Sequence, residues 1–242
     1  MTNKWLKVAL MATAIATGTS INIDAETVLY VPQDDRPVSL QYTVDTAREA
    51  GMTVLTPPQN LISGKTYQGQ ADQIMAWVEQ NAGRADVMVL STDTLIYGGL
   101  VDSRKHNIPL STLESRLKRI EGLKARHKNV RIYGFGTVMR SPRASGGGTE
   151  PAYYAEYGPT IFQIAALQDK LDSGSLTQEE TQKLMSLQAS VPVEYLQDWF
   201  DRRQKNMKIN KELIDETRSG VFNYFALGHD DTSQLSQSAL EG

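Results

Sequence analysis

Short apolar runs rich in β-branched residues alternate with helical patterns along this chain, and this alternation is what most restricts its fold. Elements that alternate in this way form a parallel sheet whose crossovers are right-handed. We therefore expect an α/β fold with a parallel (β/α) barrel-like sheet, incomplete at about five strands. An open doubly wound sheet is the alternative. The predicted strands cover 28–32, 53–56, 86–91, 130–138 and 221–227.

Helical patterns fill most of the sequence between these strands. The expected helices cover 39–50, 70–82, 153–171 and 193–218. We expect the third of them to be interrupted at Gly158 and Pro159. Capping boxes at 111–114 and 177–180 predict two further helix starts, because a hydroxyl and a carboxylate three residues apart satisfy backbone N–H groups reciprocally.

The first 25 residues have the pattern of a secretory signal peptide. Lys4 and Lys7 precede an apolar stretch at 8–16, and Ala25 is a small residue suited to cleavage. The apolar stretch is too short to span a bilayer. We therefore expect export to the periplasm or the exterior, with no membrane attachment after cleavage.

We expect the remainder, 26–242, to form a single α/β domain with a helical insertion around 141–219. No apolar helix follows the fifth predicted strand, although such a strand needs covering. We therefore also expect the domain to be truncated at its C-terminus.

The composition excludes several classes of function. The 242 residues include no cysteine, which excludes disulfides, thiolate metal sites and a cysteine nucleophile. Only three histidines are present, which disfavours a zinc site, and we expect His106 and His127 at the surface. A formal net charge of -3 means that the chain lacks the excess of positive charge that is typical of nucleic-acid-binding proteins.

Aspartates follow three of the predicted strands. Asp34 and Asp35 come after the first strand, Asp93 after the third, and Asp230 and Asp231 after the fifth. The carboxyl ends of parallel strands meet at one edge of a sheet, so these residues should converge into an acidic cleft. Neighbouring side chains usually point apart, so we expect only one of Asp34 and Asp35 to face it.

Candidate catalytic residues are Asp230, Asp231 and Asp34, because two carboxyl groups can act as acid and base where their environments separate their pKa values. The polar and aromatic side chains of the same strand-end loops suit a ring-bearing ligand. The candidate substrate-binding residues are Asp35, Arg36, Asp93, Tyr97, Arg104, Arg140, Glu150 and His229. We expect no metal cofactor; the alternative is Mg²⁺ or Ca²⁺ held by Asp34, Asp93 and Asp230.

Three segments together resemble a bacterial family known as domain of unknown function 4127. They are Val31 to Val38, Leu90 to Arg104, and Leu227 to Thr232. The resemblance runs from about residue 27 to the end of the chain, and His229 stands where the family leads us to expect glutamine. Members of the family are longer than this chain, which implies that it represents their N-terminal part. The resemblance implies no activity.

From the strand-end carboxylates we expect an exported carbohydrate-active hydrolase, similar to a glycosidase, that acts on a saccharide or another small molecule. A metal-dependent hydrolase of phosphate or amide bonds is one alternative. A non-catalytic periplasmic sugar-binding module is the other, since the carboxylates can serve as hydrogen-bond acceptors alone. The sequence predicts no nucleic-acid partner and leaves the oligomeric state open.

Overall fold

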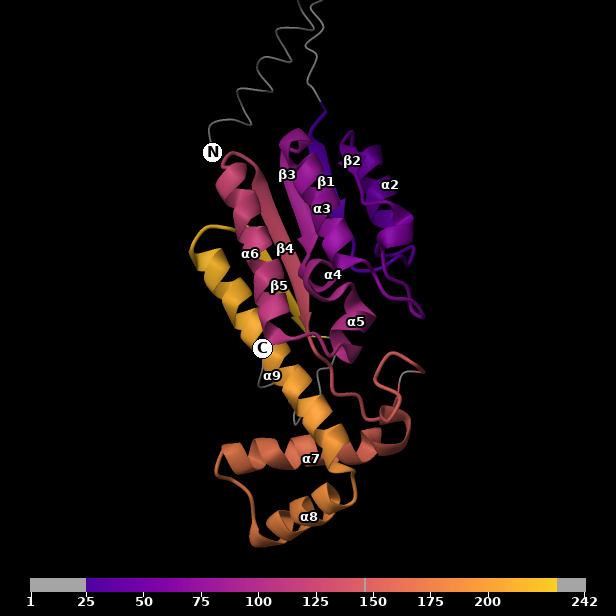
Figure 1. The fold of residues 1–242 in the computed structure, drawn as a ribbon, viewed down its shortest axis with the longest axis vertical. Helices are drawn as coiled ribbons and strands as arrows, with labels where there is room; N and C mark the ends of the chain where they lie inside the picture. The colour runs from indigo at the N-terminus through magenta and orange to yellow at the C-terminus, as the bar shows by residue number, and fades with distance from the viewer. Residues whose placement is uncertain (1–24, 146, 230–242) are drawn as a thin grey trace, which may run out of the picture.

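The computed structural model describes residues 25–145 and 147–229 of the chain. Five strands form one sheet in these residues, and every neighbouring pair is parallel (Figure 1). The expected α/β class with about five parallel strands is therefore confirmed. The strands are β1 (Thr27–Val31), β2 (Thr53–Leu55), β3 (Val87–Ser91), β4 (Arg131–Val138) and β5 (Tyr224–His229).

The strand order β2-β1-β3-β4-β5 places both β2 and β3 beside β1. In a (β/α) barrel, strands that follow one another in sequence are neighbours and the sheet closes. The described sheet is not closed, and its order is that of an open doubly wound sheet, the alternative given above. The direction in which strands are added reverses between β1 and β3. Ligands of such sheets bind outside the carboxyl ends of the strands at this reversal.

The fifth strand begins and ends later than the predicted 221–227. The Asn223 side chain accepts a hydrogen bond from the Ile132 N–H of β4 at 2.9 Å. Asn223 therefore contacts β4 through its side chain, and β5 begins at the next residue. At the other end Gly228 and His229 still pair with β4. The strand therefore carries His229 to the carboxyl edge of the sheet.

Helices join the strands. The longer ones are α2 (Gln41–Glu49), α3 (Ala71–Asn81), α6 (Leu110–Arg126), α7 (Tyr154–Asp172), α8 (Gln178–Ala189) and α9 (Val193–Arg218). Shorter ones are the 3₁₀ turns η1 (Gln59–Leu61) and η2 (Ala82–Arg84) and the helices α4 (Thr92–Tyr97) and α5 (Leu100–Lys105). Neither α4 nor α5 was predicted, and both lie at the carboxyl end of β3.

Two local predictions about helices are wrong. α6 begins at Leu110 with Pro109 as its N-cap, so the hydroxyl of Ser111 caps nothing. The Pro109 carbonyl already accepts the first helical N–H groups, which sets the start before Ser111. α7 is a single helix that continues through Pro159. The proline lies in its second turn, where it removes one donor without ending the helix.

The capping box at 177–180 is confirmed. The Thr177 hydroxyl accepts the Glu180 N–H, and the Glu180 carboxylate accepts the Thr177 N–H. The bounds predicted for α9 are confirmed as well.

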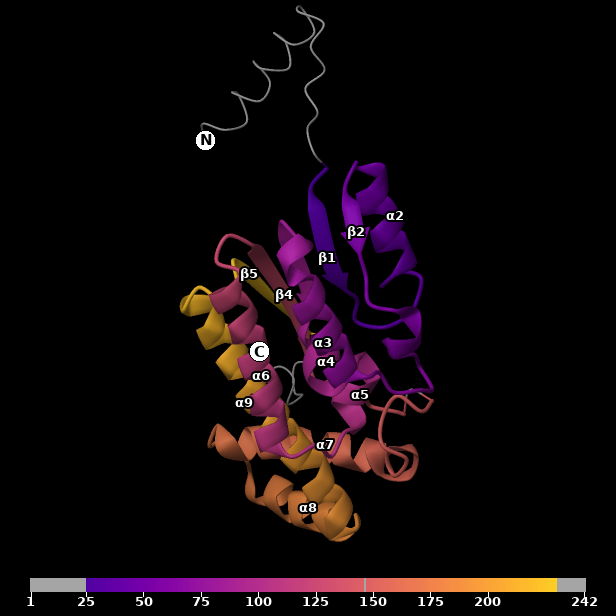
Figure 2. The ribbon, with the colours of Figure 1, turned by 45° about the horizontal axis from the view of Figure 1, so that its top comes forward.

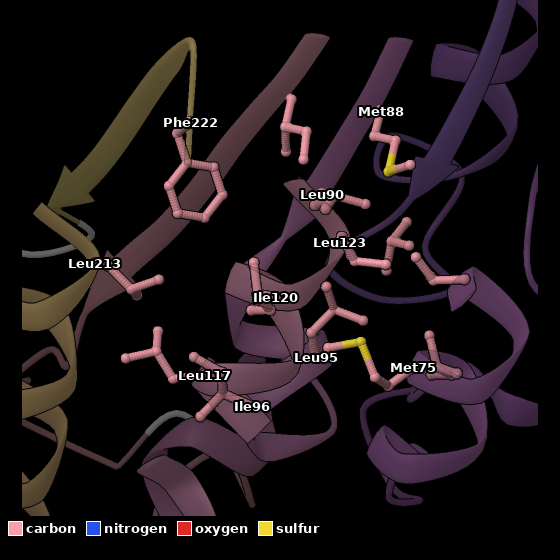
Figure 3. Close-up of a cluster of buried hydrophobic side chains, with 14 of the residues drawn as sticks. Met75, Met88, Leu90, Leu95, Ile96, Leu117, Ile120, Leu123, Leu213 and Phe222 are labelled. Atoms are coloured by element: carbon pink, nitrogen blue, oxygen red, sulfur yellow. The ribbon is translucent and has the colours of Figure 1, made fainter. Parts of the chain in front are cut away.

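A layer of helices covers one face of the sheet with apolar side chains. Figure 3 shows β3 contributing Met88 and Leu90, and α6 contributing Leu117, Ile120 and Leu123. These side chains are at most 3% exposed. Side chains from α3, α4 and α9 complete the same cluster, so the sheet and these helices form one core.

The other face of the sheet carries α2. Successive strand residues point to opposite faces. Leu29 of β1 belongs to the core cluster, whereas Val28 and Tyr30 line a groove with Thr43 and Ala47 of α2. Helices therefore lie on both faces of β1, as expected for a doubly wound sheet.

A second, smaller apolar cluster lies among α7, α8 and α9. Trp199 of α9 is fully buried there, with its ring centroid 4.5 Å from that of Tyr154. In both views α7 and α8 lie beyond one end of the strands (Figure 2). No helix in the described part of the chain is both long and apolar enough to cross a membrane.

Candidate active site at the carboxyl edge of the sheet

A pocket of about 550 Å³ lies at the carboxyl edge of the sheet. Most of its lining comes from the segments that follow β1 and β3, from the end of β4 and the loop after it, and from the end of β5. This is the edge where the strand order predicts a ligand. The loop before α3 adds Lys65. The residues that line it are Gln33, Asp34, Arg36, Lys65, Leu100, Val101, Arg104, Thr137, Arg140, Thr149, Gly228 and His229.

Asp34 lines this pocket as a carboxylate held by Arg36. It is 5% exposed, and its Oδ2 accepts Arg36 Nε at 2.8 Å and Nη2 at 2.7 Å. Its Oδ1 also accepts the backbone N–H of Arg36 at 3.2 Å. Charge-assisted bonds of this kind hold a carboxylate in one orientation.

Asp35 faces away from the pocket. Its backbone N–H donates to the Ser63 carbonyl at 2.9 Å, and its carboxylate accepts the Tyr67 hydroxyl. It lines a different hollow, together with Pro57 and Trp77. The two neighbouring carboxylates therefore point apart, as expected, and Asp34 is the one at the strand-end pocket.

Asp93 is buried behind the pocket wall at 2% exposure. Its Oδ2 accepts Gln33 Nε2 at 2.8 Å and Thr137 Oγ1 at 2.9 Å, and both donors line the pocket. Burial raises the pKa of Asp93 to about 6, although these two donors and the charge of Arg104 act in the opposite direction. One carboxyl group thus joins the ends of β1 and β4 to α4 and titrates near neutrality.

The junction of α4 and α5 is tightly packed. Gly98 has a φ of +113°, and a Cβ on Gly99 would lie 1.8 Å from Ser63 Oγ. Asp102 accepts the Gly69 N–H at 3.0 Å across the same contact. This packing fixes α5, whose Arg104 lines the pocket at only 5% exposure.

Arg140 follows β4 and is oriented by Glu150. Its Nε donates to Glu150 Oε1 at 2.8 Å, and its Nη2 donates to Thr149 Oγ1 at 2.8 Å. Glu150 is only 3% exposed, so its charge is paired within the structure. Arg140 and Thr149 line the pocket, whereas Glu150 supports them from behind.

Tyr97 is not among the residues that line the pocket. It belongs to the core cluster, and its ring stacks on His106 with the centroids 4.8 Å apart.

The prediction that His106 lies at the surface is wrong, since it is 6% exposed. Its Nδ1 accepts the Ile108 N–H, and its Nε2 lies 2.8 Å from Asn206 Oδ1 on α9. Burial lowers the pKa of His106 to about 4, because a neutral ring is favoured there.

His229 and Gly228 complete the described lining at the end of β5. Asp230 and Asp231, the other two candidate catalytic residues, follow directly and lie outside the described residues. Residues 1–24, which hold nearly all of the predicted signal peptide, lie outside them too.

The described lining is more basic than the expected acidic cleft. Arg36, Lys65, Arg104 and Arg140 line the pocket, against one carboxylate, Asp34. The difference arises because one predicted acid faces away and another is buried behind the wall. Sequence reasoning missed Lys65, which lies in a polar loop distant from any strand end.

A family model matches residues 28–242 under the description "Protein of unknown function (DUF4127)". The chain belongs to this family. A search of curated proteins and a search of solved structures each found no match.

The DUF4127 segments named above meet at the pocket. Asp34 and Arg36 come from the first segment, Arg104 from the second, and His229 from the third. Among residues 25–145 and 147–229, no group of three or more histidines or carboxylates lies close enough to hold a metal ion. Asp230, the third ligand of the Mg²⁺ or Ca²⁺ alternative, falls outside these ranges.

Proposed function

We propose that this DUF4127 chain carries the catalytic pocket of an exported carbohydrate-active hydrolase that resembles a glycosidase. The observation that carries the proposal is Asp34, a carboxylate that is fixed by Arg36 and lines a pocket at the carboxyl edge of a parallel sheet. Enzymes of this fold class place their chemistry at that edge.

Asp34 suits the role of base or nucleophile. Both roles require an ionised carboxylate that is held in one orientation. The guanidinium of Arg36 supplies the orientation. Glycoside hydrolysis also requires a carboxylic acid that protonates the leaving oxygen. We assign that role to Asp230 or Asp231, which follow the pocket residue His229 in sequence.

Asp93 acts as a positioning residue in this proposal. It does not line the pocket, but it fixes Gln33 and Thr137, which do. An amide and a hydroxyl held in this way suit hydrogen bonds with sugar hydroxyl groups. Because its pKa lies at about 6, proton uptake by Asp93 should alter the hold on both side chains at mildly acidic pH.

The proposal is tested with nitrophenyl glycosides of neutral and acidic sugars, measured by release of nitrophenolate. The full chain should hydrolyse at least one of them, and Asp34→Asn should lower kcat/KM by about 10²-fold or more. The matched control is Asp201→Asn, which makes the same change at an exposed site on α9. Equal activity of the two variants, or no hydrolysis by the unmodified chain, contradicts the proposal. Binding without hydrolysis favours the sugar-binding alternative.

Export has a separate test. If residues 1–25 are a signal peptide, the protein recovered outside the cytoplasm should begin at Glu26. Mass spectrometry of its N-terminal peptide measures this directly. A protein that remains in the cytoplasm with Met1 or Thr2 at its N-terminus contradicts export.

A further inference from the structure

A second hollow, of about 670 Å³, lies at the carboxyl ends of β1 and β2. Its lining includes Asp35 and Pro37, which follow β1, and Pro57 and Pro58, which follow β2. Trp77 of α3 lines it too, and we call it the Trp77 hollow. Ligands of doubly wound sheets bind outside the carboxyl ends of the strands. This hollow therefore lies at the edge of the sheet where a ligand is expected.

The Trp77 hollow adjoins the strand-end pocket. Consecutive side chains after β1 alternate between the two: Asp34 and Arg36 line the pocket, whereas Asp35 and Pro37 line the hollow. Consecutive Cα atoms are only about 3.8 Å apart. One short stretch of backbone therefore belongs to the wall of both.

A second segment borders both of them. In the loop 63–67, Lys65 lines the pocket. The Tyr67 hydroxyl of the same loop donates a hydrogen bond to the Asp35 carboxylate, which lines the hollow. The Asp35 N–H also donates to the Ser63 carbonyl at 2.9 Å. This loop and the segment after β1 are therefore bonded to each other between the pocket and the hollow.

The lining of the Trp77 hollow suits a sugar ring. Apolar surface comes from Trp77, Leu40 and Pro58. Arg48 and Gln59 line the hollow as exposed polar side chains, and neither side chain forms a hydrogen bond or an ion pair with a described residue. Apolar walls with a few polar groups that fix orientation are typical of small-molecule sites. A sugar has CH groups for such walls and hydroxyl groups for the polar side chains.

We infer that the substrate is an oligosaccharide that occupies both sites, with one sugar unit beside Asp34 and an adjoining unit in the Trp77 hollow. This inference rests on the proposed function, since it specifies the length of the saccharide on which the same pocket acts. The unit in the hollow packs its ring against Trp77, and its hydroxyl groups bond Arg48 and Gln59. A monosaccharide occupies one of the two sites and lacks the contacts of the other.

Calorimetric titration of the full chain with Asp34→Asn tests the inference, because this variant should bind saccharides with little hydrolysis. The probes are the monosaccharide, disaccharide and tetrasaccharide of three 1,4-linked series: glucose, N-acetylglucosamine and galacturonic acid. In at least one series the tetrasaccharide should bind about tenfold or more tightly than the monosaccharide, since linked units bind the second site intramolecularly. Equal affinity for all lengths in every series overturns the inference, and so does binding of no probe.

A second substitution assigns the gain to the hollow. Added to Asp34→Asn, Arg48→Gln should weaken binding of the preferred tetrasaccharide by about tenfold or more, because hydrogen bonds to charged groups are the stronger ones. The matched control is Arg218→Gln, since Arg218 is also exposed and also lies in the last turn of its helix. The control should leave binding unchanged, and equal affinities of the two double variants overturn the role of the hollow.

Hydrolysis and the dependence on length are separate results. Hydrolysis of nitrophenyl glycosides without tighter binding of longer saccharides contradicts the inference and leaves the proposed function standing. Tighter binding of longer saccharides without hydrolysis by the unmodified chain supports the role of the hollow and contradicts the proposed hydrolase.

Discussion

Asp93 and His106 are two buried titratable residues at opposite ends of the α4–α5 segment, and their surroundings differ. Asp93 accepts hydrogen bonds from Gln33 and Thr137, which line the pocket. His106 is bound by Asn206 of α9. Burial raises the pKa of Asp93 to about 6 and lowers that of His106 to about 4. In both cases the neutral form is favoured.

The hydrogen-bond networks of Asp93 and His106 connect to different parts of the molecule. The partners of Asp93 touch the ligand pocket, so a change at Asp93 should affect activity. The partners of His106 tie α5 to α9, which joins the layer over the sheet to the cluster around Trp199. A change there should affect stability. Burial and a shifted pKa alone do not mark a functional residue; the connection to a pocket does.

Asn206→Leu should give the largest change in stability. Asn206 is 3% exposed, and its amide bonds His106 on one side and the Ser103 carbonyl at 2.8 Å on the other. Both groups would be left buried without a partner, so the free energy of unfolding should fall by about 2–4 kcal/mol in urea titrations. Activity per folded molecule should not change. A variant as stable as the original chain contradicts the structural role.

The pH dependence of stability should separate the two residues. The pKa of Asp93 is about 6 in the folded chain against 3.8 in the reference state, so the folded state binds the proton at a higher pH than the unfolded state does. Its contribution to stability therefore falls as pH rises through this window. The pKa of His106 is about 4 in the folded chain against 6.5 in the reference state, so the unfolded state binds the proton at a higher pH than the folded state does. Its contribution falls as pH decreases through that window.

The two effects oppose each other in the unmodified chain, and single variants should reveal them. Asp93→Asn should lose stability more steeply than the original chain as pH falls from 6.5 to 4. His106→Gln should gain stability over the same change. The slopes should differ by at most about 1.4 kcal/mol per pH unit for each proton. Thermal unfolding at a series of pH values measures this, and parallel curves for all three proteins contradict it.

Tyr97→Phe should give the smallest change. Tyr97 is 6% exposed, and its hydroxyl finds no hydrogen-bond partner among the described residues. Removing it should raise the free energy of unfolding by up to about 1 kcal/mol. Activity should stay the same if Tyr97 belongs to the core rather than to the substrate-binding residues. A tenfold rise in KM would instead support the role in substrate binding predicted from sequence.

Patterns of hydrophobicity predicted the framework of the fold well. The strand Val87–Ser91 could be predicted because it is buried on nearly its whole length, which gives a short continuous apolar run. The apolar side of α6, which includes Leu117 and Ile120, could be predicted because burial of one helix face imposes a period of 3.6 residues. Buried polar residues leave no such signal. Arg202 and Asn206 of α9 are each 3% exposed, although their types favour the surface.

The site was predicted only in part for a related reason. Strand ends indicated Asp34 and Arg104, because the geometry of a parallel sheet brings strand ends together. The same rule did not show that Asp35 faces away, since side-chain direction depends on the Tyr67 contact. It did not indicate Lys65 either, because Lys65 lies in a loop far from any strand end, and tertiary contacts such as that of Gly69 with Gly98 hold this loop beside the pocket.

The central claim is that the pocket at the carboxyl edge of the sheet performs the chemistry. It is tested most directly by comparing kcat/KM of Asp34→Asn and Asp35→Asn on one glycoside substrate. These neighbours have the same side chain but point in different directions: Asp34 lines the pocket and Asp35 lines another hollow. We predict a loss of about 10²-fold or more for Asp34→Asn, and a loss at least tenfold smaller for Asp35→Asn. Equal losses, or a larger loss for Asp35→Asn, would contradict the claim.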